Sequence, residues 1–331
     1  MTTTRYDVIG IGNAIVDVIA RAEDDFLVQQ KMHKGGMALI DEPRAESIYD
    51  AMGPAVEISG GSAANTIVGV AGFGARAAFV GKVKDDELGR AFAHDIRAAG
   101  VAFDTPPAAD GPSTARCYVM VTPDGERTMN TFLGAAQDLH PADVDPAAIA
   151  ASAITYLEGY LWDPPHAKEA FRKAAKIAHD AGRKVALTLS DPAWVALQHD
   201  AFKALLPDVD ILLGNETEAL ELTGESSLEA AAAVLADSVE VVALTRGPAG
   251  AIASGGGEIV SVGAEPVAKV EDTTGAGDLF AAGFLLGLAR QRPLEDCLRL
   301  GALAAAEVIS HIGARPQTML ATLAAARGLG L

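Results

Sequence analysis

A glycine-rich segment, residues 272–278 (DTTGAGD), runs directly into the apolar segment 279–285 (LFAAGFL). The glycines predict a tight turn and the apolar run predicts a buried helix, so a helix N-terminus is expected near Gly275. Unpaired backbone N–H groups at a helix start, with no large side chains over them, bind anions. Asp278 falls in the first turn, where its carboxylate can take a proton from a nucleophile that attacks the anion. This combination indicates phosphoryl transfer.

Apolar strands alternate with helices along the chain from about residue 139. This alternation predicts an α/β fold with a parallel sheet that is covered on both faces. Ligands of such sheets bind outside the carboxyl ends of the strands. Polar or glycine-containing clusters follow several predicted strands and are therefore candidate site residues: Gly12-Asn13, Glu158-Gly159, Ser190-Asp191, residues 215–218 and residues 245–247.

Two polar residues, Asn13 and Asp17, follow the predicted N-terminal strand 8–12. A carboxylate at the mouth of a strand can accept two hydrogen bonds from a vicinal diol. The same two residues can equally cap a turn. The small residues of 59–66 (SGGSAANT) allow a ligand to approach the backbone, or allow a helix to pack tightly, and the sequence leaves both alternatives open.

Two common nucleotide-binding motifs are incomplete or missing. Gly10 and Gly12 superficially open a dinucleotide fingerprint, but Ile15 occupies the position of the third glycine. This disfavours a dinucleotide oxidoreductase. The P-loop ending Gly-Lys-Ser/Thr does not occur in the chain, so a P-loop kinase is excluded.

A hairpin is predicted where the extended runs 114–121 and 127–133 flank the segment 122–126 (TPDGE). Arg127, at the start of the second run, can reach an anion, although a lone Arg is usually a surface charge. Three apolar residues of the hairpin can line a ligand slot or belong to the core: Met129, Phe132 and Leu133.

Composition narrows the functional classes. The formal net charge of −18 and the lack of a Lys/Arg cluster argue against nucleic-acid binding. Cys117 and Cys297 show no paired spacing, which favours a reducing, cytoplasmic location. The longest apolar run, 279–289, is too short to span a bilayer, and the N-terminus lacks a signal-peptide apolar region. The seven histidines lack metal-ligand spacing, so no zinc or iron site is expected.

The segment 272–285 resembles the C-terminal signature of the PfkB carbohydrate kinases, a ribokinase-like family, at every restricted position. Residues 60–65 (GGSAAN) resemble its N-terminal signature, 215–218 (NETE) its Asn-x-x-Glu motif and 245–247 (TRG) its nucleotide-binding turn. All four segments occur in the family order, and the resemblance covers essentially the whole chain. It implies a central, mostly parallel sheet flanked by helices, with a small β-sheet lid.

The resemblance also implies a division of the chain into two parts. The large α/β nucleotide-binding and catalytic domain is expected to comprise residues 1–12, 46–104 and 134–331. The small β lid is expected to comprise residues 13–45 and 105–133. In some relatives this small sheet forms a dimer interface, so the sequence leaves open whether the protein is a monomer or a homodimer.

Within the family, residues 12–17 (GNAIVD), 60–62 and 293–314 resemble the adenosine kinase branch. Ile67, Lys84 and Ala302 depart from common family residues. The implied reaction is phosphorylation of the 5′-hydroxyl of adenosine by ATP. The alternatives are a sugar kinase acting on ribose, fructose or 2-keto-3-deoxygluconate, and a non-catalytic nucleoside-binding protein. The expected partner is a small nucleoside or sugar, not a nucleic acid or a membrane.

The resemblance assigns roles to individual residues. Asp278 is the expected catalytic base, and the backbone N–H groups of Gly275, Ala276 and Gly277 are expected to hold the transferred phosphoryl group, with Arg127 adding positive charge. Asn215 and Glu218 are expected to bind Mg²⁺ through water. Asp272 and Thr274 fit a loop that binds a monovalent cation such as K⁺. The residues expected to bind ATP are Asn215, Thr245, Gly247, Gly250, Thr274, Gly275 and Gly277.

The same resemblance assigns the acceptor site. The ribose hydroxyls are expected to contact Asn13, Asp17, Gly61 and Asn65. The base is expected to contact Met129, Leu133 and Tyr160.

Overall fold

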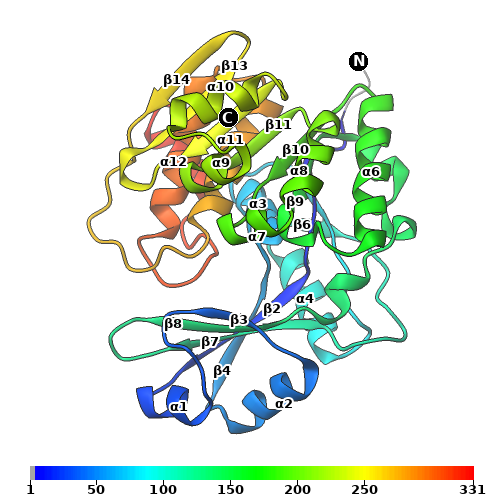
Figure 1. The fold of residues 1–331 in the computed structure, drawn as a ribbon, viewed down its shortest axis with the longest axis vertical. Coiled ribbons are helices and arrows are strands. Elements are labelled where there is room, and N and C mark those ends of the chain that lie inside the picture. Colours follow the sequence, from blue (N-terminus) through cyan, green and yellow to red (C-terminus); the bar gives the residue numbers. More distant parts are fainter. Residues whose placement is uncertain (1–3) are drawn as a thin grey trace.

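The computed structural model describes residues 4–331, which form two β-sheets of different size (Figure 1). The larger sheet has nine strands in the order β14-β13-β12-β11-β10-β9-β1-β5-β6. The seven strands from β12 to β6 in this order are parallel to one another. Strands β13 and β14 are added antiparallel at the β12 edge. The strands are β1 (Tyr6–Ile11), β5 (Ala77–Val80), β6 (Val101–Phe103), β9 (Ser152–Glu158), β10 (Lys184–Thr188), β11 (Ile211–Asn215), β12 (Val241–Thr245), β13 (Ala251–Gly255) and β14 (Glu258–Val262).

Helices cover both faces of the large sheet, as the strand–helix alternation predicts. Alternate residues of β1 enter different cores: Val8 packs in one, and Ile9 and Ile11 pack in the other. Because a strand covered on both faces buries consecutive side chains, it is apolar throughout. The first core contains α3 (Ser62–Gly72), α4 (Glu87–Ala98), α11 (Ala276–Ala289), α12 (Leu294–Val308) and α13 (Leu320–Ala326). The second contains α5 (Pro146–Ala150), α6 (Pro165–Asp180), α7 (Pro192–Leu197), α8 (His199–Leu205), α9 (Glu216–Thr223) and α10 (Leu228–Ala236).

Helix α11 begins where the sequence predicts, because Gly275 is its N-cap and adopts a left-handed conformation with φ of 79°. The helix is buried from Leu279 to Gly287. It packs against α12 through glycines. A Cβ on Gly283 would overlap the backbone of Leu300, so the two helix backbones are in direct contact there.

The smaller sheet has five strands in the order β3-β8-β7-β2-β4 and lies below the large domain in Figure 1, with α1 and α2 on its far side. Its strands are β2 (Ile15–Arg21), β3 (Met37–Leu39), β4 (Ala55–Gly60), β7 (Ala115–Val121) and β8 (Arg127–Phe132), and its helices are α1 (Asp24–Gln29) and α2 (Glu42–Ala51). The pairing of β7 with β8 is antiparallel, which confirms the predicted hairpin.

One segment of the predicted division is wrong. Residues 46–104 were assigned to the large domain, yet they contain β4, which pairs antiparallel with β2 from Ile15↔Gly60 to Ala20↔Ala55. The predicted boundary at residue 46 also falls within α2, which contacts β8 of the small sheet. The cause is local, because the glycines and serines of 59–62 are typical of a loop and hide the end of an edge strand. Among residues 4–331, no helix has the length and apolar character needed to cross a bilayer.

The contact between α11 and α12 supports a stability prediction. Replacing Gly283 by Ala places a methyl group against the backbone of Leu300, which must move away. We expect this variant to lose about 1–3 kcal/mol of unfolding free energy, as overpacked cores do. The matched control is Gly53→Ala, where nothing lies within 4 Å of the added methyl group, and a change within about 0.5 kcal/mol is expected. Equal denaturation midpoints for the two variants in urea would contradict the close packing.

Candidate active site

The strand order of the large sheet reverses beside β1, because β5 and β6 lie on one side of β1 and β9 to β12 lie on the other. Parallel sheets bind ligands at the carboxyl ends of the strands at such a point. Asn13 follows β1 there, and Glu158 ends β9. The Asn13 side-chain Nδ2 donates to Glu158 Oε1 at 2.6 Å, and the backbone N–H of Ala63 in α3 donates to Glu158 Oε2 at 2.8 Å. Three elements therefore meet at one buried carboxylate.

Glycines allow the loop between β4 and α3 to approach this point closely. A Cβ on Gly61 would overlap the backbone oxygen of Asn13, and a Cβ on Gly60 would overlap the Asp17 carboxylate. Gly61 also has a φ of 99°, which side chains other than hydrogen disfavour. In this structure Gly60 and Gly61 therefore allow two other parts of the chain, Asn13 and Asp17, to approach the loop.

Asp278 lies in the first turn of α11 and is held by two side chains of α3. Its Oδ1 accepts a hydrogen bond from Ser62 Oγ at 2.6 Å, and its Oδ2 accepts one from Asn65 Nδ2 at 3.0 Å. Burial raises the pKa of Asp278, while these hydrogen bonds and the charge of Arg315 oppose the rise. The structure thus holds the carboxylate in one orientation beside the helix N-terminus.

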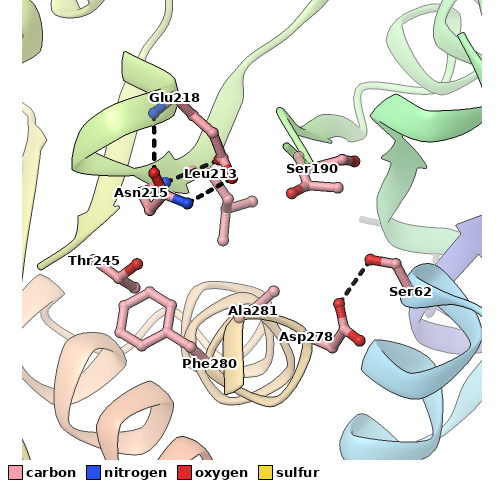
Figure 2. Close-up of a pocket in the computed structure, with 12 residues that line it drawn as sticks. Ser62, Ser190, Leu213, Asn215, Glu218, Thr245, Asp278, Phe280 and Ala281 are labelled. Atoms are coloured by element: carbon pink, nitrogen blue, oxygen red, sulfur yellow. Dashed lines mark hydrogen bonds between the residues drawn. The ribbon is translucent and has the colours of Figure 1, made fainter. Parts of the chain in front are cut away.

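A cavity extends from Asp278 along α11 to the N-terminus of α9. Figure 2 shows Asp278 and Ser62 at one end of this cavity and Asn215, Glu218 and Thr245 at the other. Seven of its twelve lining residues are Gly, Ala, Ser or Thr, so few bulky side chains enter it. The cavity brings together six elements, α3, β10, β11, α9, β12 and α11, and is lined by Ser62, Thr188, Ser190, Leu213, Gly214, Asn215, Glu218, Thr245, Gly277, Asp278, Phe280 and Ala281.

Asn215 and Glu218 form a capping box at the start of α9. Glu218 N donates to Asn215 Oδ1 at 2.9 Å, and Asn215 Nδ2 donates to Glu218 Oε1 at 2.6 Å. Burial raises the pKa of Glu218 to about 7, against the hydrogen bond from the backbone of Asn215. A carboxylate in the cavity wall with spare lone pairs suits a hard cation that keeps its water. Within residues 4–331, no group of three or more His, Cys, Asp or Glu side chains is arranged so that it could bind a metal ion directly.

Arg127 joins the small sheet to the loop before α11. Its Nη1 contacts the Asp272 carboxylate and lies 3.2 Å from Thr274 Oγ1. Asp272 also accepts hydrogen bonds from the backbone N–H of Gly313 at 2.8 Å and of Thr274 at 3.0 Å. The pKa of Asp272 is lowered overall, because these hydrogen bonds and the charge of Arg127 outweigh the opposing effect of burial. In this arrangement the guanidinium of Arg127 occupies the Asp272 carboxylate and the Thr274 hydroxyl, the two groups predicted to face a monovalent cation.

The predicted acceptor residues lie on two sides of the same space. Asp17 and Met129 lie on one face of the small sheet, two positions apart in its register, and Arg127 lies on that face too. Burial raises the pKa of Asp17 to about 6, against the charges of Arg315 and Arg127. Tyr160 follows Glu158, and burial raises the pKa of its phenol, as do the charges of Asp191 and Asp278.

Leu133, Gly247 and Gly250 were predicted to bind ligands, but they do not line the cavity that contains Asp278. Leu133 follows β8 and is half-buried. Gly247 and Gly250 bound the turn between β12 and β13.

Arg315, in the segment after α12, is a further residue of this region. Its Nη1 donates to the backbone oxygen of Ala64 at 3.0 Å, and its Nε donates to that of Ser59 at 3.0 Å. These contacts lie on either side of Gly60 and Gly61. No local pattern marks Arg315, because its partners lie about 250 positions away in the chain. Ser62 lies inside the segment that resembles the N-terminal signature and Glu158 at a predicted strand end, but the sequence assigns neither residue a role.

Comparison with known proteins agrees with this geometry. The model of the "pfkB family carbohydrate kinase" matches residues 48–320. The chain belongs to this family. An adenosine kinase from Sinorhizobium meliloti is 52% identical and superposes with a TM-score of 0.89 over 98% of this chain and 99% of that one. A probable sugar kinase protein from Rhizobium etli CFN 42 is 49% identical, with a TM-score of 0.92 over 99% and 100% of the two chains.

A third relative carries a sugar-acid name. The 5-dehydro-2-deoxygluconokinase of Bacillus licheniformis is 29% identical over 264 residues, which cover 76% of this chain and 80% of that protein. As a pfkB-family kinase with a ribokinase-like fold, this chain is a phosphotransferase that acts on a hydroxyl group of a small molecule, a nucleoside or a sugar. Kinases of the family use ATP and typically Mg²⁺.

The site of this pfkB-family chain has a predictable effect on stability. Burial raises the pKa of Glu158 and of Glu218 to about 7, and the two side chains are 1% and 4% exposed. A carboxyl whose pKa is higher in the folded state binds more protons when folded, so its ionisation destabilises the fold as pH rises towards 7. Carboxyls with a lowered pKa, such as Asp272, lose their stabilising contribution only in a more acidic range.

We therefore expect the free energy of unfolding to rise as the pH falls from about 8 to about 5, with Glu158 and Glu218 contributing on the order of 2 kcal/mol each. Urea denaturation at constant ionic strength measures this. Glu218→Gln should reduce the slope against pH, whereas the exposed Glu57→Gln should leave it unchanged. The same slope in all three proteins would show that the buried carboxyls are not its source.

Proposed function

We propose that this kinase phosphorylates the 5′-hydroxyl of adenosine with ATP, giving AMP and ADP. The observation that carries the proposal is the placement of Asp278. Its carboxylate is held by Ser62 and Asn65 at the N-terminus of α11, at the end of a cavity that leads to Asn215 and Glu218. The adenosine kinase name of the S. meliloti relative, at 52% identity, supports adenosine as the acceptor.

Asp278 acts as the base that accepts the hydroxyl proton. The higher pKa that burial gives Asp278 makes it a better proton acceptor than an exposed Asp. Phosphoryl transfer has a loose transition state, so a weak base suffices when the nucleophile is well positioned. Ser62 and Asn65 supply that positioning, because each occupies one oxygen of the carboxylate.

The N-terminus of α11 stabilises the charge of the transferred phosphoryl group. The N–H of Ala276 donates to Thr273 O at 3.2 Å, which keeps the turn closed. The N–H groups of Gly275 and Gly277 and the positive end of the helix dipole supply the anion site. Fixed donors of this kind contribute most of the catalysis in such reactions.

ATP occupies the cavity that runs along α11 away from Asp278, with its phosphates near Thr274, Gly275 and Gly277 and its nucleoside towards Thr245, Gly247 and Gly250. Glu218 and Asn215 would hold Mg²⁺ through water, and the metal would supply charge neutralisation to the phosphates. The carboxylate of Glu218 lines the cavity, which suits this role.

Arg127 changes partners when ATP binds. The triphosphate competes with Asp272 for the guanidinium, and the small sheet closes over the site as the side chain turns. Closure excludes water and suppresses hydrolysis of ATP. Asp272 and Thr274, once released by Arg127, can then face a monovalent cation such as K⁺.

The acceptor lies between the two sheets. Its ribose hydroxyls donate to Asp17, Asn13 and Asn65 beside Gly61. The base contacts the side of the small sheet that carries Met129 and the region of Leu133 and Tyr160. In this arrangement the 5′-hydroxyl lies near Asp278, because Asn65, which would bind the ribose, also donates to that carboxylate.

A sugar kinase is the second candidate, because the R. etli relative is named a probable sugar kinase and the B. licheniformis relative a 5-dehydro-2-deoxygluconokinase. Release of ADP from ATP, measured over a panel of adenosine, other nucleosides, ribose, fructose and 2-keto-3-deoxygluconate, separates the candidates. Binding of adenosine without ADP release would indicate a non-catalytic nucleoside-binding protein.

Asp278→Asn tests the base. The Asn side chain is nearly the same shape but cannot accept the proton, so kcat should fall by about 10³-fold or more, within the usual effect of a lost base and its charge. Adenosine affinity, measured by calorimetry, should change by less than about tenfold. Asp296→Asn, which removes a carboxylate at the first turn of α12 outside the cavity, serves as the control and should leave kcat unchanged. Near-normal turnover by Asp278→Asn would refute the assignment.

Arg127→Gln tests the charge over the phosphates. We expect kcat to fall by about 10²-fold, the usual effect of losing one donor to a transition-state oxyanion. The control is Arg21→Gln, since Arg21 is an exposed cation of the same sheet. If both variants keep wild-type kcat and ATP KM, then Arg127 only ties the small sheet to Asp272.

A further inference from the structure

Glu158 is a buried carboxylate that the proposed reaction does not use. It ends β9 and is 1% exposed, and both of its oxygens accept hydrogen bonds. Oε1 accepts from the side-chain Nδ2 of Asn13 at 2.6 Å and from its backbone N–H at 3.3 Å. Oε2 accepts from the backbone N–H of Ala63 at 2.8 Å. Glu158 therefore fixes the orientation of Asn13 relative to the start of α3.

The contact with Glu158 decides which atom of Asn13 remains free. Nδ2 is used by Glu158, whereas Oδ1 is buried and has no hydrogen-bond partner among the described residues. Asn65 shows the same arrangement, because its Nδ2 donates to Asp278 and its buried Oδ1 has no partner. Buried polar atoms are rarely left unpaired, so each of these oxygens is suited to a donor from a ligand.

We propose that Glu158 is a positioning residue for acceptor choice: it turns Asn13 so that the acceptor site presents only oxygen acceptors, and thereby selects neutral, hydroxyl-bearing acceptors over sugar acids. This inference rests on the proposed function, since it places the acceptor beside Asn13, Asp17 and Asn65. A hydroxyl group can donate to each of these oxygens. A carboxylate has no proton to donate and would meet like charge.

The cations nearest to the site are already engaged. Arg315 donates to the backbone oxygens of Ser59 and Ala64. Arg127 contacts Asp272 and, in the proposed reaction, turns from Asp272 to the triphosphate. Neither guanidinium is therefore available to pair with a carboxylate on the acceptor beside Asn13. The site thus opposes an anionic acceptor through both its hydrogen-bonding pattern and its charge.

Protonation of Glu158 should weaken this arrangement. The charged or titratable groups that act on Glu158 are Asp278 of α11 and the phenols Tyr156 and Tyr160, together with the N–H of Ala63 at the start of α3. Burial raises the pKa of Glu158 to about 7, against its hydrogen bonds. Below that pH one oxygen carries a proton, and the Asn13 amide loses its charged partner and can turn.

The test compares wild type, Glu158→Gln and Asp7→Asn in steady-state kinetics with adenosine and with the sugar panel. Asp7 is also a buried carboxylate that holds a backbone N–H, but it lies at the opposite end of β1. We expect Glu158→Gln to raise the KM for the neutral acceptor by about tenfold, the effect of losing a hydrogen bond to a charged group. The KM for ATP should change by less than about twofold, and Asp7→Asn should leave both KM values unchanged.

The pH profile separates a specific role for Glu158 from general structural damage. In wild type, kcat/KM for the neutral acceptor should fall as the pH drops through about 7, and in Glu158→Gln this limb should move to lower pH, where Asp17 titrates. An unchanged KM and an unchanged pH limb in Glu158→Gln would overturn the inference. Efficient turnover of 2-keto-3-deoxygluconate by wild type, in preference to adenosine and neutral sugars, would overturn it as well.

A folding defect in Glu158→Gln does not remove the test, since the wild-type protein alone supplies two results. We expect no turnover of the sugar acid at pH 8 and a rise in neutral-acceptor KM below pH 7. The proposed function fails separately, if adenosine is not phosphorylated at all. In that case, a neutral sugar that is phosphorylated with the Glu158-dependent pH limb would still support the role of Glu158.

Discussion

The close approach of three chain segments at the carboxyl edge of the large sheet is the constraint on which the site depends. The loops after β1 and β4 touch through Gly60 and Gly61, and the end of β9 meets both through Glu158. A side chain at either glycine would overlap the neighbouring backbone or the Asp17 carboxylate. Because the loops cannot separate without losing these contacts, Asn13, Asp17 and the start of α3 hold fixed relative positions.

A second loop ties this acceptor side to the phosphate side. The N–H of Gly313 donates to Asp272, Ala314 packs against Gly275, and Arg315 donates to the backbone of Ser59 and Ala64. Three consecutive residues thus contact both the turn that starts α11 and the loop that starts α3. The two helices that hold Asp278 and its partners are therefore braced from one side by the same short segment.

The site concentrates acidic groups in a poorly solvated space. Burial raises the pKa of Asp17, Glu158, Glu218 and Asp278. The charges of Arg127 and Arg315 oppose this rise at Asp17, and that of Arg315 opposes it at Asp278. Such an arrangement costs stability when the carboxyls ionise, and functional sites commonly carry this cost. It also favours ligands that bring protons or cations, such as hydroxyl groups and magnesium-bound phosphates.

The sequence by itself determined the alternation of strands and helices, the turn at Gly275 and the β7–β8 hairpin, because these follow from local periodicity and glycine placement. It also determined that polar groups gather at the carboxyl edge, since parallel strands share that edge. It did not place β4, whose pairing with β2 joins residues about 40 positions apart and whose end resembled a loop. Nor did it find Arg315 or the role of Glu158.

Only the tertiary structure decided which polar atoms are engaged and which remain free. The sequence placed Arg127 near an anion, and the structure shows that this anion is Asp272 of the chain itself. Asn13 and Asn65 were named as ligand residues, but their free oxygens follow from contacts with Glu158 and Asp278 that span 145 and 213 positions. Such contacts depend on how loops fold back on one another, and local sequence carries no record of that geometry.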